Sequence, residues 1–296
     1  CRTNRSTASD SCVHEDCTAR ENAPAVVSCL SMLLPGGKSF DRAILGRTGR
    51  EVCRLGVASS YGAPAEAVER AFERGVNYIY WGSRRTRAFA RALRNLAPHR
   101  DRFLLVLQTY SRVASLVGWS VELALRELRF DYCDILLLGL WNRPAWPRIV
   151  EAARKLTERG LVRHLALSTH KRPLIPQLAN GSDFDVFHVR YNAKHTGAER
   201  DVFPHLPAEN RPGIVSFTAT SWGQLLRRRR VPKSERVPTA GDCYRFVLSN
   251  AAVDVCLTAP ANAAQMDHAL EALGKGPLSG EEMAWMRRVG GAMHGE

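Results

Sequence analysis

An uninterrupted apolar run at residues 135–138 follows Asp134 and ends at Gly139. A strand with one face in water alternates apolar and polar residues, so a run without alternation predicts a strand buried on both faces. Such strands are typical of parallel sheets that are covered by helices. The segment therefore indicates an α/β fold, and its last residue, Gly139, supplies no side chain that could do chemistry.

The same pattern recurs along the chain, where strand-like segments alternate with segments of helical periodicity. Pro64 is suited to open a helix, and Ser279 with Glu282 forms the capping-box pattern of a last one. Eight strand-helix units in roughly 250 residues are typical of a (β/α)8 TIM barrel. We predict one such barrel as a single domain over residues 39–296. Its strands are expected at residues 52–58, 77–81, 103–109, 133–138, 162–168, 185–191, 213–218 and 253–259.

Residues 1–38 differ from the rest of the chain. They are rich in Ser, Thr, Asn and small residues and show no sustained period, which predicts a poorly structured, disordered N-terminal extension. Cys12, His14 and Cys17 are metal-binding residue types, but their spacing matches no zinc or iron–sulfur pattern well. We therefore predict no metal site.

Hydropathy and charge indicate which kinds of partner the protein is expected to lack. The apolar stretches fall short of the roughly 20 residues that cross a bilayer, so we expect a cytoplasmic protein without a membrane partner. The formal net charge of +13 lies within residues 39–296, because basic and acidic residues balance in 1–38. Most arginines fall at helical intervals, as on solvated helix faces, and aromatic residues are not interleaved with them. We therefore expect no nucleic-acid partner.

Short segments over residues 40–275 resemble the aldo-keto reductases. They are Leu45-Gly46-Arg47-Thr48-Gly49, Gly75-Val76-Asn77-Tyr78, Leu125-Arg126-x-Leu128 before Asp131-Tyr132-Cys133-Asp134, Gly160-Leu161-Val162-Arg163, Ser168, Tyr191-Asn192 and Gly223-x-Leu225. Each segment is weak alone, but together they occur in order and on the expected elements. The resemblance implies a TIM barrel that transfers hydride from a nicotinamide cofactor, NADP or NAD, to a small-molecule carbonyl substrate.

The resemblance also implies four catalytic positions, which the family fills with Asp, Tyr, Lys and His. Here they hold Tyr80, Arg85, Gln108 and Gly139, and a shift of two residues would bring Tyr110 to the third position. All four have changed, so the active site is degenerate. Arg85 cannot act as the acid, because an arginine keeps its proton up to a pH of about 12.

Other groups could supply the proton. Period two places Tyr80 at the mouth of the barrel, where Arg84 or Arg85 could stabilise its phenolate. The alternative is that Tyr80 and Trp81 plug the mouth. Tyr110, His170 and His188 are further candidates for the acid, although a lone histidine is more often structural.

The residues that the resemblance assigns to the cofactor have changed less. Ser168, Thr169 and His188 take the places beside the nicotinamide amide, and Phe217 takes the place of an aromatic that stacks on the ring. The remaining assigned residues are Gly223 and Leu225 in the pyrophosphate loop, and Asn262 and Gln265 near the 2′-phosphate. Arg227 opens a run of four arginines, which either binds phosphate or forms a solvated basic loop.

Two functions therefore stand open. The first is a divergent NAD(P)-dependent oxidoreductase of aldo-keto reductase type with a non-standard proton donor. The second is a noncatalytic barrel that binds a nucleotide or a protein partner, with its mouth closed by Tyr80, Trp81 and Trp141.

Overall fold

The computed structural model describes residues 40, 42–82 and 84–294. The predicted extension at 1–38, with Cys12, His14 and Cys17, lies outside the described residues. Within the described part, no group of His, Cys, Asp and Glu side chains is arranged to hold a metal ion. None of the helices described there combines the length and apolar character that a membrane span requires.

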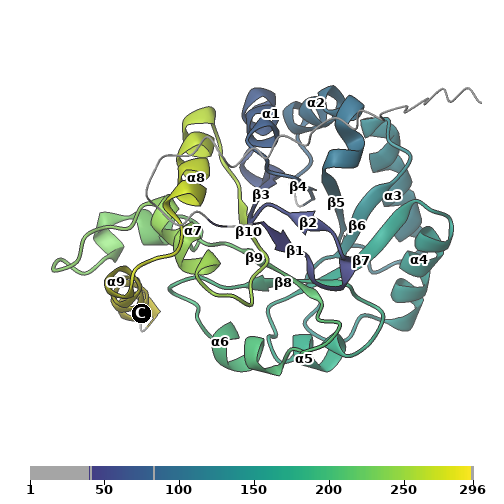
Figure 1. The fold of residues 1–296 in the computed structure, drawn as a ribbon. Helices are drawn as coiled ribbons and strands as arrows, with labels where there is room; N and C mark the ends of the chain where they lie inside the picture. Colours follow the sequence, from purple (N-terminus) through teal and green to yellow (C-terminus); the bar gives the residue numbers. More distant parts are fainter. Residues whose placement is uncertain (1–39, 41, 83, 295–296) are drawn as a thin grey trace, which may run out of the picture. The chain divides into compact units, whose positions relative to one another are not determined.

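Eight parallel strands form a closed barrel, which confirms the predicted (β/α)8 fold (Figure 1). Neighbouring strands follow the order β10-β3-β4-β5-β6-β7-β8-β9. The strands are β3 (Leu55–Ala58), β4 (Tyr78–Trp81), β5 (Leu104–Thr109), β6 (Cys133–Leu138), β7 (Val162–Thr169), β8 (Val186–Arg190), β9 (Gly213–Phe217) and β10 (Val255–Thr258). All eight predicted strands are present.

The first predicted strand was too long at its start. Val52 belongs to a separate hairpin, in which β1 (Ala43–Ile44) pairs antiparallel with β2 (Glu51–Val52). The chain then leaves the hairpin at Cys53, whose N–H donates to Asn77 Oδ1 at 2.8 Å, and the barrel strand begins two residues later at Leu55.

The hairpin covers the end of the barrel at which the strands begin (Figure 1). Leu45 and Val52 are fully buried in the cluster of side chains inside the barrel. Gly46, at φ +44°, lies so close to the start of β9 that a Cβ there would be 2.2 Å from Gly213 N. The opposite end, where the strands finish, is the end that carries function in TIM barrels.

Helices surround the barrel (Figure 1). They are α1 (Ala65–Glu73), α2 (Arg87–Asn95), α3 (Ala114–Leu128), α4 (Pro147–Glu158), α5 (Leu174–Ala179), α6 (Ala198–Asp201), α7 (Ala240–Leu248), α8 (Ala263–Lys275) and α9 (Gly280–His294). The predicted capping box of α9 is confirmed, because Glu282 N donates to Ser279 Oγ at 3.2 Å and Ser279 N donates to Glu282 Oε2 at 2.8 Å. The helices after β7 and β8 have only six and four residues.

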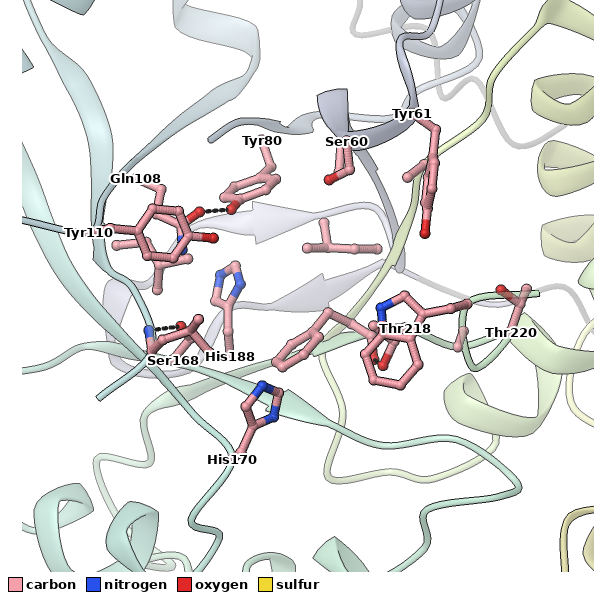
Figure 2. Close-up of a pocket in the computed structure, with 18 of the residues that line it drawn as sticks. Ser60, Tyr61, Tyr80, Gln108, Tyr110, Ser168, His170, His188, Thr218 and Thr220 are labelled. Carbon is pink, nitrogen blue, oxygen red and sulfur yellow. Dashed lines mark hydrogen bonds between the residues drawn. The ribbon is translucent and has the colours of Figure 1, made fainter. Parts of the chain in front are cut away.

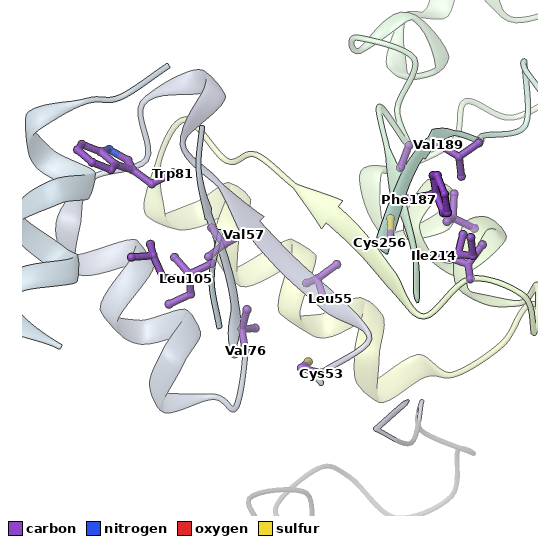
Figure 3. Close-up of a cluster of buried hydrophobic side chains, with 14 of the residues drawn as sticks. Cys53, Leu55, Val57, Val76, Trp81, Leu105, Phe187, Val189, Ile214 and Cys256 are labelled. Atoms are coloured by element: carbon purple, nitrogen blue, oxygen red, sulfur yellow. The ribbon is translucent and has the colours of Figure 1, made fainter. Parts of the chain in front are cut away.

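The alternation of side chains along each strand produces two cores. Tyr78 and Tyr80 point into the barrel, whereas Ile79 and Trp81 join the larger cluster between the strands and the helices. Figure 3 shows part of that outer cluster, including Trp81. Trp141 also lies in the outer cluster. Neither Trp81 nor Trp141 lines the cavity at the barrel mouth, so the prediction that these two residues close the mouth is wrong.

Candidate functional site

A cavity of about 370 Å³ opens at the end of the barrel where the strands finish (Figure 2). All eight barrel strands, or the residues directly after them, contribute to its lining. The polar lining residues are Ser60, Tyr61, Tyr80, Gln108, Tyr110, Ser168, His170, His188, Thr218, Thr220 and Tyr244. Among the described residues that line the cavity there is no Asp, Glu, Lys or Arg. The volume lies within the usual range for small-molecule sites, and its surface is aromatic and uncharged.

Tyr80 and Gln108 form a hydrogen-bonded pair at the ends of β4 and β5. Both side chains are almost fully buried, and Tyr80 Oη donates to Gln108 Oε1 (Figure 2). Arg85 does not line the cavity. Its Nη2 donates to the main-chain carbonyl oxygen of Gln108 at 3.0 Å. Burial lowers the pKa of Arg85, and interactions with Glu127, Cys133 and Tyr80, in that order, oppose this shift.

The space around Gly139 explains why no side chain stands there. A Cβ at this position would lie 2.3 Å from Gln108 Nε2 and 2.7 Å from Tyr110 Cε1. Gln108 and Tyr110 therefore fill the space that a side chain at 139 would need. Two of the changed positions, Gln108 and Gly139, are consequently linked by packing, together with Tyr110.

A second buried pair lies deeper in the barrel and was missed by the sequence analysis. Tyr78 Oη lies 2.8 Å from His188 Nε2. Burial raises the pKa of Tyr78 well above its usual value and lowers the pKa of His188 to about 3. Tyr78 therefore keeps its proton and His188 stays neutral, and the tautomer of the imidazole decides which of the two donates the hydrogen bond. The sequence signal for this pair was strand alternation, which places Tyr78 on the inner face of the barrel together with Tyr80.

Ser168, His170 and Phe217 gather on the side formed by β7 and β9. Ser168 Oγ accepts a hydrogen bond from Leu140 N at 2.9 Å, so its own proton is left to donate. The His170 ring stands edge-on to Phe217, with ring centroids 5.8 Å apart. His170 Nδ1 is buried and has no hydrogen-bond partner in the described part of the chain. Burial, followed by the charge of Arg190, lowers the pKa of His170.

Three residues assigned to the cofactor by resemblance are engaged elsewhere. Thr169 does not line the cavity, and its Oγ1 accepts from Lys171 N at 2.9 Å. Asn262 Oδ1 accepts from Gln265 N at 2.9 Å, and Gln265 Oε1 accepts from Ala261 N at 2.8 Å. Asn262 and Gln265 thus cap the first turn of α8.

The loop after β9 has an unusual backbone. Thr218, Ser221 and Trp222 have φ values of 60°, 50° and 55°, which are left-handed conformations that non-glycine residues rarely adopt. Gly223 follows at φ 75° and donates its N–H to Thr220 Oγ1 at 3.1 Å. Because Thr218, Ala219, Thr220 and Trp222 line the cavity, this strain lies at the candidate site.

The residues after this loop lie outside the cavity. Leu225 is fully buried in the outer core, and Arg227 is exposed. Arg228 donates to the carbonyl oxygens of Val231 at 2.9 Å and Glu235 at 2.7 Å, which closes the basic loop on itself. At least one arginine of the run therefore stabilises its own loop.

Solved structures provide the comparison, since no family model matches the chain and no match was found among curated proteins. An aldo-keto reductase from Bacillus halodurans in its holo form aligns with a TM-score of 0.70 at 18% identity, over 84% of this chain and 96% of that one. An aldo/keto reductase from Klebsiella pneumoniae in complex with NADP and acetate aligns with a TM-score of 0.69 at 21% identity, over 86% and 95%. The chain therefore has the fold of the aldo-keto reductases.

Proposed function

We propose that this protein is a divergent oxidoreductase of aldo-keto reductase type that binds NADP(H) and acts on a small carbonyl or alcohol substrate. The observation that carries the proposal is the uncharged aromatic cavity at the functional end of a barrel with the aldo-keto reductase fold. The Klebsiella pneumoniae structure contains NADP, which supports the choice of cofactor. In this proposal Tyr80 supplies the proton, in place of the usual tetrad.

The residues on the β7–β9 side fit a nicotinamide group. Phe217 offers an apolar aromatic surface, and the Ser168 hydroxyl has a proton to donate. His170 Nδ1 is buried and has no hydrogen-bond partner among the described residues, and in this proposal a polar group of the ligand binds beside it. NADPH, when bound, supplies the hydride for reduction of a carbonyl group.

In this proposal the proton is donated by Tyr80, with the help of Arg85 and Gln108. A phenol has a pKa near 10 in water, so it gives up a proton at neutral pH only where a cation stabilises the phenolate. Arg85 donates to the main-chain carbonyl oxygen of Gln108, and in this proposal its charge stabilises the Tyr80 phenolate. For the reaction, the Tyr80 hydroxyl must turn from Gln108 Oε1 to the substrate oxygen. Between turnovers, solvent would return a proton to Tyr80, and the hydroxyl would again donate its hydrogen bond to Gln108 Oε1.

One observation favours the noncatalytic alternative. The Tyr80 hydroxyl donates to Gln108 within the protein, and among the described lining residues none is a charged Asp, Glu, Lys or Arg that could assist proton transfer. A barrel of this kind would bind a nucleotide and perform no reduction.

The test is NADPH oxidation by the wild-type protein with a panel of aldehydes and quinones. We predict that Tyr80→Phe lowers kcat/KM by about 100-fold or more, which is the usual contribution of a general acid. Tyr61→Phe is the matched control, because Tyr61 also lines the cavity but is 55% exposed. Equal turnover by Tyr80→Phe and the wild type would remove Tyr80 from the mechanism. NADPH binding without turnover of any substrate would favour the noncatalytic barrel.

A further inference from the structure

Arg190 is the last residue of β8 and lies at the rim of the cavity. It follows His188 by two residues, so the alternation of the strand places both on the inner face of the barrel. Its register partner on β9 is Phe217, which lines the cavity. The Arg190 guanidinium lies over the ring of Trp222, another lining residue, with Cζ 6.0 Å from the ring centroid.

No carboxylate in the described part of the chain pairs with this guanidinium. Some partly buried arginines pair with a carboxylate, such as Arg100 with Asp134 at 2.7 Å and Arg172 with Asp201 at 2.8 Å. Others, such as Arg85, donate to main-chain carbonyl oxygens. Within the described residues Arg190 forms no ion pair, although burial and the neighbouring Arg172 both lower its pKa. A partly buried cation without a counter-ion is unfavourable unless a ligand supplies one.

Further positive groups and donors surround Arg190. Lys194 Nζ donates to the amide oxygen of Gln224 at 3.0 Å, so its charge is also not neutralised by this contact. Arg190 and Lys194 are among the charges that lower the pKa of His195, whose ring lies 6.5 Å from that of Trp222. His170, with its buried Nδ1 free of protein partners in the described part, also interacts electrostatically with Arg190.

We propose that Arg190, with Lys194 and His170, forms a binding site for an anionic group at the rim of the cavity beside Phe217 and Trp222. The ligand group is a phosphate or a carboxylate, because a guanidinium binds both through two parallel hydrogen bonds. The uncharged cavity takes the planar, neutral part of the same ligand. The anion belongs either to a dinucleotide or to the substrate, and the site does not depend on oxidoreductase activity.

The test is calorimetric titration of the full chain with inorganic pyrophosphate, malonate and NADPH as separate probes. Arg190→Gln should weaken the binding of pyrophosphate or malonate at least about 10-fold, as expected for the loss of a charge-assisted hydrogen bond. Arg190→Lys keeps the charge and should lose less. Arg87→Gln is the matched control, because it removes the same charge from the exposed start of α2, outside the cavity, and should change affinity less than about threefold.

Each outcome identifies or overturns the site. Weaker binding of pyrophosphate and NADPH in Arg190→Gln assigns the anion to a dinucleotide, whereas weaker binding of malonate alone assigns it to a carboxylate substrate. Pyrophosphate binding that depends on Arg190, without NADPH oxidation, keeps the site and removes the oxidoreductase proposal. The inference is overturned if both anions bind equally well to Arg190→Gln and the wild type, or if neither binds the wild type at millimolar concentration.

Discussion

The two sides of the cavity differ in how their polar groups are used. On the β4–β6 side, Tyr80 donates to Gln108, and Gln108 with Tyr110 fills the space beside Gly139. On the β7–β9 side, Ser168 keeps a proton to donate and His170 Nδ1 has no hydrogen-bond partner in the described structure. The first side is satisfied by the protein itself, whereas the second retains hydrogen-bonding capacity for a ligand.

The close packing on the β4–β6 side affects the catalytic positions that have changed. Substitution of a single position on the β4–β6 side would not restore a tetrad, because Gln108, Tyr110 and Gly139 are packed against one another. The β7–β9 side has no comparable obstacle. Cofactor binding and proton transfer therefore place different demands on the two sides, and they can be separated by mutation.

The largest effect should be a loss of folding stability at low pH. It depends on His188, which is buried inside the barrel beneath both sides of the cavity. Burial lowers the pKa of His188 to about 3 from an unfolded value of 6.5, so the unfolded chain binds the extra proton first as pH falls. The stabilising contribution is complete above about pH 6.5 and is lost as pH approaches 3. Stability should fall by about 1.4 kcal/mol per pH unit, or roughly 3 kcal/mol between pH 6.5 and 4.5.

Urea unfolding of His188→Gln at several pH values measures this contribution. The variant should lose most of the acid-dependent slope that His188 supplies. His268→Gln is the control, because His268 is exposed on the surface of α8. An identical slope for the wild type and His188→Gln would contradict the assignment of a neutral, buried His188.

A smaller effect should test the packing of the β4–β6 side. Gly139→Ala places a methyl group against Gln108 and Tyr110, and we expect a loss of about 1–3 kcal/mol in the free energy of unfolding. The double variant with Gln108→Ala should be less destabilised than the sum of the two single variants, because removing the amide makes room. Strict additivity would contradict the proposed packing.

Gly118→Ala provides the control of opposite sign. A Cβ at Gly118 in α3 would meet its nearest neighbour, Leu156 Cδ2, at 3.7 Å, which is ordinary contact. Alanine should therefore stabilise the helix by up to about 1 kcal/mol.

The smallest effect should distinguish the two sides by ligand affinity. Ser168→Ala removes a donor from the β7–β9 side and should weaken NADPH binding by about threefold to tenfold, as one hydrogen bond contributes about 1 kcal/mol. Gln108→Ala on the other side should leave the dissociation constant within about twofold. Equal losses in the two variants would mean that the cofactor contacts both sides.

Much of the fold could be predicted from the sequence, because unbroken apolar runs and helix signals recur eight times. Strand alternation also predicts which side chains point into the barrel and which point outward. It placed Tyr80 inward correctly, and the same period places Trp81 and Thr169 outward, where the structure has them. The Tyr78–His188 pair could not be predicted, since it joins strands on different parts of the barrel across 110 residues of sequence. The inward orientation of Arg190 could be predicted, because Arg190 follows the inward-facing His188 by two residues on the same strand. That it pairs with no carboxylate of the described residues could be seen only in the three-dimensional structure.

The most direct test of the central proposal is a titration of the protein with NADPH, followed by the quenching of tryptophan fluorescence, since Trp222 lines the cavity. We predict saturable binding with a micromolar dissociation constant, equivalent to roughly 8 kcal/mol, and weaker binding by Ser168→Ala. No binding of NADPH or NADH at millimolar concentration would contradict the proposal and would mean that the barrel shares only its fold with the aldo-keto reductases.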